Sequence, residues 1–167
     1  RYHDLREAAT SVRTQTYDDV ELVLVSDGNE AVTRQFERDF GDAEDVVITA
    51  LAENSGLLEA RNHGADVASG DVVAFIDDDA IADPEWVAHL VESYEQQDAI
   101  AVGGRMVPEW VAGKPEFLPE EFYWLIGVTH RGFGPDGDPS AAGEVRNTFG
   151  SNLSFRREIF RDLGGFD

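Results

Sequence analysis

The sequence has no cysteine, and only one of its 13 basic residues, Lys114, is a lysine. The absence of cysteine excludes disulfide bonds and thiolate metal sites, and it fits a reducing compartment. No apolar run approaches the length that crosses a bilayer, and no signal peptide is visible. We therefore expect a single cytoplasmic domain of 167 residues, in contact with a membrane only peripherally.

Acidic residues dominate the charge: 34 aspartates and glutamates give a formal net charge of −21. Such a surface repels phosphates and argues against a nucleic-acid partner. A large excess of one sign also destabilises a compact state by self-repulsion unless salt screens the charges. The near absence of lysine favours adaptation to high salt over the alternative of an ordinary acidic protein.

Strands and helices alternate through the first hundred residues. Apolar periodicity predicts helices over residues 3–15, 31–40, 57–68, from Asp83 onward and 156–163, and strands over residues 20–25, 45–50, 72–76, 99–107 and 148–155. This order predicts a parallel sheet with helices on both faces. A Gly103-Gly104 pair inside one strand indicates a bulge or a close ligand. Residues 108–143 are mostly irregular, and so either functional or partly disordered.

Three carboxylates, Asp77, Asp78 and Asp79, follow the predicted strand 72–76. In open α/β sheets, ligands bind at the carboxyl ends of the strands. Adjacent acids repel one another unless a cation lies among them, and Mg²⁺ takes one or two carboxylates together with substrate phosphates. The run therefore indicates a metal–diphosphate site, and a solvated acidic turn is the alternative.

Two further segments carry polar groups beside glycine. Asp27 follows a predicted strand, where its carboxylate can accept hydrogen bonds from a nucleobase; the alternative is an Asx turn that caps the next helix. Arg61 lies on the inward face of the helix 57–68, so it needs an anionic or planar partner. A diphosphate or a base would serve, and so would a structural salt bridge to Asp27 or Asp77.

Together these segments resemble the family-two inverting glycosyltransferases of GT-A fold, over nearly the whole chain. The shared motifs, in the family's order, are Val25-Ser26-Asp27-Gly28-Asn29, Asn54-Ser55-Gly56, Ala60-Arg61-Asn62-His63-Gly64, Ser69-Gly70-Asp71, Asp77-Asp78-Asp79, Gly150-Ser151-Asn152, Phe155-Arg156-Arg157 and Gly164-Gly165-Phe166-Asp167. The resemblance implies an α/β, Rossmann-like fold with a mostly parallel sheet flanked by helices. Residues 1–107 would bind the nucleotide sugar and residues 108–167 would form the acceptor side.

The resemblance also implies roles for single residues. Asp27 would recognise uracil or another base, with Asn54 in the same nucleotide-sugar site. Arg61 would contact the base or the diphosphate. Asp77 or Asp78 would contact the ribose. Asp79, with Asp77, would bind Mg²⁺ or Mn²⁺, which bridges the two phosphates of the donor.

The chain departs from the family pattern in three places. The family's first strand would precede Arg1, and its catalytic base would lie beyond Asp167, so we expect a domain truncated at both ends. Ser26 stands where an acid is common, which leaves base recognition to Asp27. A piece ending at Asp167 is therefore expected to bind metal and nucleotide without turnover.

A narrower resemblance, to archaeal enzymes that add glucuronic acid to a sugar on dolichyl phosphate, involves the irregular segment. It rests on Leu118-Pro119-Glu120-Glu121-Phe122, Trp124, Gly127, Thr129-His130-Arg131-Gly132 and Arg146-Asn147. It implies a glycan or lipid-linked acceptor, with Arg131 and Arg146 available to a uronate or a lipid phosphate. His130 is interpreted as a satisfied loop residue. The aromatic side chains either stack on substrate or pack as core; they are Trp110, Phe117, Phe122, Tyr123 and Trp124.

Two other functions stay open at this point. A non-catalytic sugar-nucleotide-binding domain that regulates a partner is supported by the expected position of the base beyond Asp167. A phosphatase or nucleotidyltransferase could use the acidic run 77–79, but that function leaves the segment 54–64 unexplained.

Overall fold

The computed structural model describes residues 2–167. The helices are α1 (Tyr2–Arg13), α2 (Glu30–Phe40), α3 (Leu57–Val67), α4 (Trp86–Gln96) and α5 (Arg157–Asp162), with 3-10 turns η1 (Glu120–Ile126) and η2 (Pro135–Gly137). The strands are β1 (Leu22–Asp27), β2 (Val46–Leu51), β3 (Val72–Ile76), β4 (Ala101–Gly103) and β5 (Asn152–Arg156). Among the described residues, no helix is both long and apolar enough to span a membrane.

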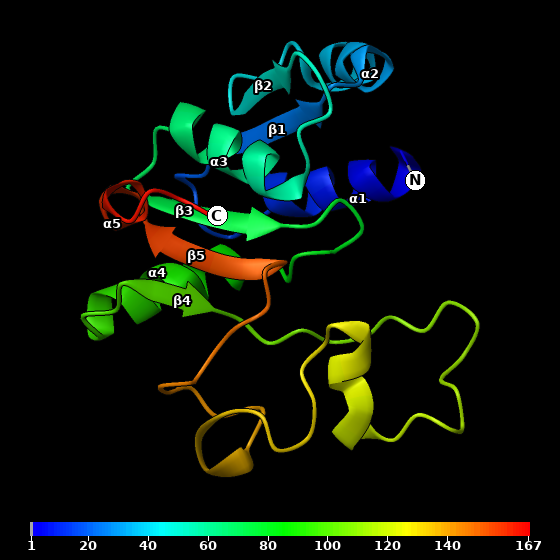
Figure 1. The fold of residues 1–167 in the computed structure, drawn as a ribbon, viewed down its shortest axis with the longest axis vertical. Coiled ribbons are helices and arrows are strands. Elements are labelled where there is room, and N and C mark those ends of the chain that lie inside the picture. The colour runs from blue at the N-terminus through cyan, green and yellow to red at the C-terminus, as the bar shows by residue number, and fades with distance from the viewer. Residues whose placement is uncertain (1) are drawn as a thin grey trace.

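The strands form a parallel pair and a three-stranded antiparallel group. β1 pairs with β2 in parallel, with Leu22 opposite Val46, while β5 lies between β3 and β4 and runs antiparallel to both. β1 and β3 point the same way in Figure 1, and α3 lies across them. The expected α/β architecture is present, and β5 is the antiparallel strand in a sheet that was expected to be mostly parallel. An apolar pattern specifies which residues are buried and carries no signal for strand direction.

Apolar side chains on the helices cover the strands in two clusters. In the first, Phe36 of α2 is 1% exposed and packs with Leu22 and Leu24 of β1, and Ala9 and Val12 bring α1 against them. The second joins Ala65 of α3, Val73 and Phe75 of β3, and Phe160 of α5. The helical spacing of these residues places them on one side of each helix, which explains why the predicted helices form.

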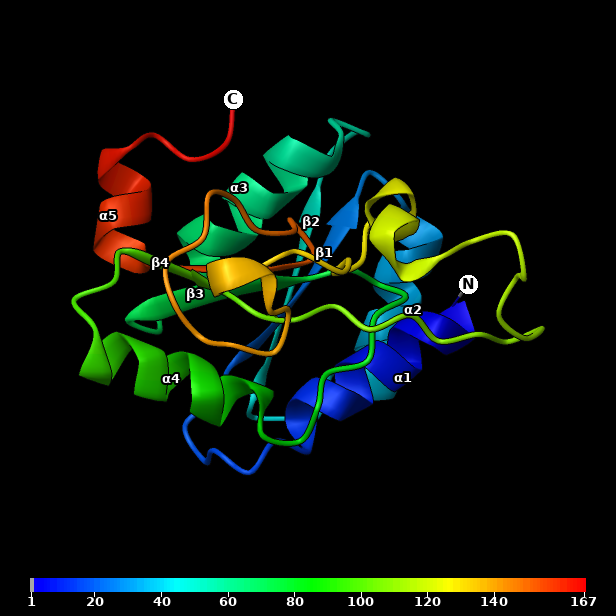
Figure 2. The ribbon, with the colours of Figure 1, turned by 90° about the horizontal axis from the view of Figure 1, so that it is seen from below.

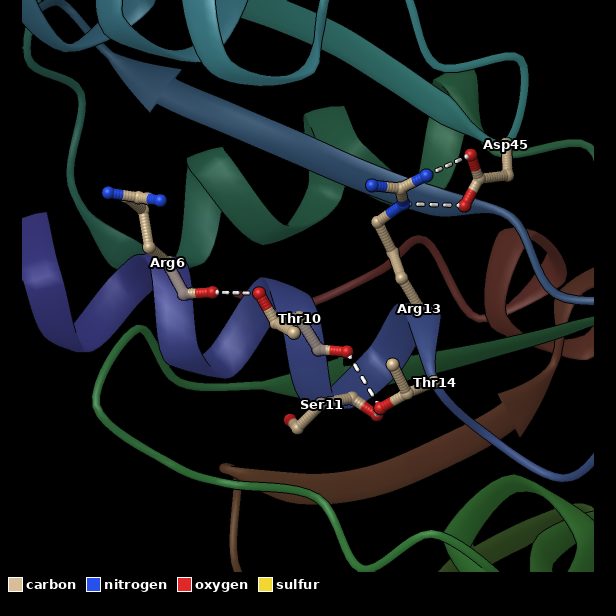
Figure 3. Close-up of polar contacts among 6 residues, drawn as sticks. All are labelled: Arg6, Thr10, Ser11, Arg13, Thr14 and Asp45. Carbon is tan, nitrogen blue, oxygen red and sulfur yellow. Dashed lines mark hydrogen bonds and ion pairs between the residues drawn. The ribbon is translucent and has the colours of Figure 1, made fainter.

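Two threonines of helix α1 form hydrogen bonds within the helix, and an ion pair links the helix to the residue before β2 (Figure 3). Thr10 and Thr14 donate to carbonyl oxygens one turn back, at 2.7 and 2.9 Å. The Arg13 guanidinium donates two bonds to Asp45, at 2.7 and 3.0 Å, just before β2. The hydrogen bonds from Arg13 lower the pKa of Asp45. Because both side chains are more than a third exposed, this pair contributes little to stability.

Two expected elements are shorter in the structure. The strand expected over residues 99–107 is reduced to β4. At its end, a Cβ at Gly103 would overlap Thr148, and one at Gly104 would meet the Asn152 side chain. The atoms that lie closest to these two glycines therefore belong to the protein itself. This finding corrects the expectation that the glycines mark a bulge or a closely approaching ligand. Helix α4 begins at Trp86, after a turn in which Asp83 accepts the Glu85 N–H.

Residues 104–151 leave the sheet after β4 and return at β5, with only the short turns η1 and η2 between (Figures 1 and 2). A small cluster of Leu118, Tyr123 and Val128, with Trp110 packed against it, organises this segment. The segment thus has an apolar nucleus of its own beside the main sheet.

Candidate functional site

The carboxylate of Asp27 binds the start of α3. Asp27 ends β1, and its two oxygens accept the N–H groups of Ser55 at 2.7 Å and Gly56 at 2.9 Å. A negative charge is favourable at this position because the first N–H groups of a helix have no partner within the helix. The alternative that Asp27 caps α2 is wrong, since the side chain of Asn29 fills that role.

The loop 53–56 lies directly on the turn that follows β1. Gly28 has a φ of +64°, and a Cβ at this position would overlap the backbone of Glu53 and Asn54. Ser26 is buried and donates from its hydroxyl to the carbonyl oxygen of Asn29 at 2.9 Å, which holds the turn closed. Asp27 and Asn54, both predicted site residues, are thereby brought together at the carboxyl end of β1.

Arg61 connects α3 with the end of β3. Its Nη2 donates to Oδ1 of Asp77 at 2.8 Å; the side chains are 14% and 40% exposed. This ion pair is the structural salt bridge considered above for Arg61, and a Cβ at Gly150 would lie 3.0 Å from Nη1 of the same guanidinium. Gly64 lets the helix approach β1, since a Cβ there would lie 3.0 Å from the Val25 side chain. Helix α3 therefore joins the ends of both strands.

The two other acids of the run, Asp78 and Asp79, are exposed on the turn after β3. Within residues 2–167, the three carboxylates of residues 77–79 are not close enough together to hold a metal ion by themselves. The three ligating side chains that do lie close together are those of His3, Asp4 and Glu7, exposed on α1. Hard cations accept as few as one or two carboxylates when a diphosphate supplies further oxygens. The all-oxygen donor set at the end of β3 fits Mg²⁺ or Mn²⁺ in its chemistry.

Asn152, the first residue of β5, lies opposite Ile76 in the sheet and connects β5 with α4 and with the chain that follows β4. Its Oδ1 accepts from Trp86 Nε1 at 2.8 Å and from the Gly104 N–H at 3.1 Å, and its Nδ2 donates to the Arg105 carbonyl at 3.3 Å. Next to it, Ser154 is fully buried and lies 2.9 Å from the Tyr94 hydroxyl, whose pKa is raised by burial. The motif residue Asn152 thus has a structural function that the sequence did not indicate.

The aromatic residues of the irregular segment divide between core and surface. Tyr123 is buried and meets Trp110 edge-on at 5.8 Å between ring centroids. Phe117, Phe122 and Trp124 are 85%, 49% and 54% exposed. The two alternatives for these residues, core packing and availability to a ligand, therefore each apply to some of them.

The polar residues of the segment also differ from expectation. The interpretation of His130 as a satisfied residue is wrong, because its buried Nδ1 has no hydrogen-bond partner within residues 2–167. Arg131 pairs with Glu121 at 3.2 Å on the surface. Arg146 is exposed, and its side chain forms no hydrogen bond or ion pair within residues 2–167.

The sequence did not predict a further contact next to Arg61. Asn62 exchanges two hydrogen bonds with the backbone of Phe166, 104 residues further along the chain. Asn62 belongs to the motif Ala60-Arg61-Asn62-His63-Gly64, which indicated a ligand site. The motif did not predict a contact between Asn62 and Phe166.

The fold is that of the GT-A glycosyltransferases. The mannosyltransferase PcManGT from Pyrobaculum calidifontis, solved in complex with GDP-Man and Mn²⁺, matches with a TM-score of 0.66 and 22% identity, over 100% of this chain and 44% of its own. TarS of S. aureus, residues 1–349, matches with a TM-score of 0.73 and 19% identity, over 99% and 47%.

The chain belongs to glycosyl transferase family 2, whose sequence model matches residues 1–164. It is 52% identical over 168 residues to glucosyl-dolichyl phosphate glucuronosyltransferase of Haloferax volcanii, covering 100% of this chain and 52% of that protein. It is 35% identical over 100 residues to glycosyltransferase GlyA of Streptococcus pneumoniae, covering 59% and 14%. The chain thus spans about half the length of the Haloferax relative.

Proposed function

We propose that the protein containing this chain transfers a sugar from a uridine-diphosphate sugar to an acceptor hydroxyl, with inversion. The observation that carries the proposal is the arrangement around α3, where Asp27 binds the helix entrance and Arg61 binds Asp77. Polar groups from the carboxyl ends of β1 and β3 meet there, which is where ligands bind in α/β sheets. Membership of glycosyl transferase family 2 supports a sugar-transfer function for this site.

Each residue has hydrogen-bonding capacity left for the nucleotide. A carboxylate offers about four lone-pair positions, so Asp27 can accept a uracil N–H in addition to its two amide bonds, with Asn54 beside it. A guanidinium has five N–H donors, of which Asp77 uses one, and the others suit a diphosphate. Asp77 or Asp78 would accept hydrogen bonds from the ribose hydroxyls.

Asp79, together with Asp77, would hold Mg²⁺ or Mn²⁺. Arg61 occupies Oδ1 of Asp77, so Oδ2 is the oxygen on that residue for a cation. When bound, a divalent cation supplies positive charge that offsets the charge of the departing diphosphate. A structural neighbour was solved with GDP-Man and Mn²⁺, and TarS was solved with UDP-GlcNAc, which supports this class of donor and cofactor.

The acceptor side is residues 108–167. Inversion requires a base that takes the proton of the acceptor hydroxyl on the opposite face of the sugar. We propose a lipid-linked glycan as acceptor, supported by the name of the Haloferax relative. Exposed apolar side chains on η1, among them Trp124, Leu125 and Ile126, suit peripheral contact with the cytoplasmic face of a membrane.

Calorimetric titration with UDP, GDP and dTDP, each with and without Mn²⁺, tests the site. We expect UDP to bind best and Mn²⁺ to raise its affinity about tenfold or more, a difference of about 1.4 kcal/mol. Asp79→Ala should remove this dependence on Mn²⁺, because it deletes the exposed carboxylate at the end of β3. Asp71→Ala is the matched control, since Asp71 is an exposed acid at the opposite end of the same strand.

Two results would contradict this site: UDP affinity that ignores Mn²⁺ in the wild type, or an Asp79→Ala variant with unchanged Mn²⁺ dependence. Loss of UDP binding in the Asp71→Ala control would point to damage of β3 as a whole. Sugar transfer by the full-length protein separates the enzyme from a regulatory domain that only binds the nucleotide.

We also propose that the acidic surface adapts the protein to high salt. The net charge of −21 implies repulsion between exposed carboxylates, and molar salt shortens the screening length to about 3 Å, from about 10 Å at 0.1 M. The urea midpoint of unfolding should therefore rise between 0.1 M and molar KCl. A midpoint that stays level or falls over this range rejects the adaptation.

A further inference from the structure

The backbone around His130 is fixed from both sides by other parts of the chain. Before it, Thr129 donates from its N–H to the Met106 carbonyl oxygen at 3.1 Å and accepts the Met106 N–H on Oγ1 at 2.8 Å. After it, Arg131 donates from its N–H to the Glu120 carbonyl oxygen at 3.1 Å. The chain that continues from β4 and the start of η1 therefore set the position of His130 together.

The two ring nitrogens of His130 have different surroundings. Nδ1 is buried without a hydrogen-bond partner, the one side-chain atom in this state within residues 2–167. Nε2 has no partner there either and is not among the buried unpaired atoms, so it reaches the surface. A proton on Nδ1 would leave a buried N–H orphaned, which is rarer in proteins than an orphaned acceptor. The proton therefore belongs on Nε2, where it forms a neutral, outward N–H donor.

Two half-buried phenylalanine rings continue from His130 toward the proposed donor site. The Phe133 ring meets the imidazole edge-on, with 5.5 Å between centroids, and the Phe149 ring lies 5.5 Å from that of Phe133. Gly150 follows Phe149, and a Cβ at Gly150 would lie 3.0 Å from Nη1 of Arg61. We refer to His130, Phe133 and Phe149 as the aromatic wall. It leads from the irregular segment to the guanidinium for which a diphosphate ligand is proposed above.

A sugar ring matches the chemistry of the aromatic wall. The faces of a pyranose carry C–H groups that can pack on aromatic rings, while the hydroxyls at its rim need hydrogen-bond partners. A phosphate matches the wall poorly, because a desolvated charge needs charged or several donors. The wall offers one neutral N–H beside apolar rings, and this combination favours an uncharged sugar.

We propose that the aromatic wall binds the sugar of the acceptor, and that Nε2–H of His130 is a specificity-determining donor to one of its hydroxyls. The inference rests on the proposed function, in which residues 108–167 form the acceptor side. The rings of Phe133 and Phe149 would hold the apolar face of the sugar. Because Gly150 joins the wall to Arg61, a sugar bound there lies next to the donor diphosphate.

Calorimetry on the full-length protein, with UDP and Mn²⁺ present, tests the ligand class with two probes, octyl glucoside and octyl phosphate. The wild type should bind octyl glucoside more tightly than octyl phosphate. His130→Phe should raise the Kd for octyl glucoside about three- to tenfold, as expected for the loss of one hydrogen bond between neutral groups. The Kd for UDP should change less than about twofold. His89→Gln, at an exposed histidine of α4, is the control and should leave both Kd values unchanged.

The variants His130→Gln and His130→Asn show which nitrogen makes the contact. The amide nitrogen of glutamine reaches about as far as Nε2, and that of asparagine only as far as Nδ1. Glutamine should therefore restore most of the wild-type affinity for octyl glucoside, while asparagine should bind as weakly as phenylalanine at this position. Equal affinities of the two amide variants contradict donation from Nε2.

Nitrogen NMR of the protein labelled with ¹⁵N-histidine gives a readout that needs neither ligand nor turnover. The His130 signals are those absent from His130→Gln, and they should show the Nε2–H tautomer in the wild type. This measurement and the two amide variants decide the question even where His130→Phe does not fold.

Four results overturn the inference: an Nδ1–H tautomer, no binding of octyl glucoside to the wild type, tighter binding of octyl phosphate, or an unchanged Kd for octyl glucoside in His130→Phe. A loss of UDP affinity equal to that for octyl glucoside also contradicts an acceptor site. A wild type that binds UDP and octyl glucoside together but transfers no sugar to a lipid-linked acceptor counts against the proposed function alone, and supports the aromatic wall as a sugar site.

Discussion

Gly28→Ala should lower the free energy of unfolding by about 2–5 kcal/mol and abolish the UDP binding proposed above. Two costs add at this position: about 1–2 kcal/mol for an L-residue in the left-handed region, and about 1–3 kcal/mol for overpacking. The second cost arises because the new Cβ meets the backbone of Glu53 and Asn54, which cannot rotate away as a side chain can. Relief requires the loop 53–56 to move, which breaks the bonds from Ser55 and Gly56 to Asp27.

Gly113→Ala is the matched control for Gly28→Ala. Gly113 also has a positive φ, of +88°, but nothing lies within 4 Å of the position its Cβ would take. Only the conformational cost of about 1–2 kcal/mol applies there, and UDP binding should persist. Urea unfolding and UDP calorimetry measure both quantities. Equal destabilisation by the two variants, with UDP binding retained in Gly28→Ala, would contradict the close approach at the end of β1.

Asn152→Ala should lower the free energy of unfolding by about 2–4 kcal/mol, because it removes a buried side chain that serves three partners. The Trp86 indole N–H and the Arg105 carbonyl would lose their bonds to the side chain. The Gly104 N–H would lose its bond to Oδ1 and keep its bond to the Asn152 carbonyl oxygen, at 3.3 Å. Each unsatisfied buried group costs about 1–3 kcal/mol, reduced wherever water can enter.

Asn147→Ala provides the comparison for Asn152→Ala, since Asn147 is an exposed asparagine in the loop before the same strand. Its unfolding free energy should stay within about 0.5 kcal/mol of the wild type. Trp86 fluorescence should shift in Asn152→Ala alone, as its indole N–H loses a protein partner. An Asn152→Ala variant as stable as the wild type would show that water replaces all three bonds.

The sequence predicted β3 and its acids to the residue, because a run of five apolar residues stands between a Ser-Gly-Asp turn and three aspartates. Helices α2 and α3 begin and end within one residue of the prediction, since apolar periodicity marks both their face and their length. Such signals are local: each lies in the segment whose structure it predicts.

The parts that could not be predicted depend on contacts between distant residues. Asp27 binds two backbone N–H groups, 28 and 29 residues away, and a backbone donor has no signature in the sequence. The partner of Asn62 is likewise a backbone group, that of Phe166. The close approach of Gly103, at the end of β4, to Thr148 likewise joins residues that only the folded chain brings together.

The position of residues 104–151 between two adjacent antiparallel strands has a consequence for how such proteins diversify. β4 and β5 are paired, so the segment starts and finishes at one spot, like the loop of a very long hairpin. Closing a flexible loop becomes only slowly costlier with length, by about 0.6 kcal/mol for each doubling. Insertions, deletions or wholesale exchange in this stretch would leave the sheet's pairing intact. Sequence changes could therefore alter the surface of residues 104–151 while the pairing of β4 with β5 persists.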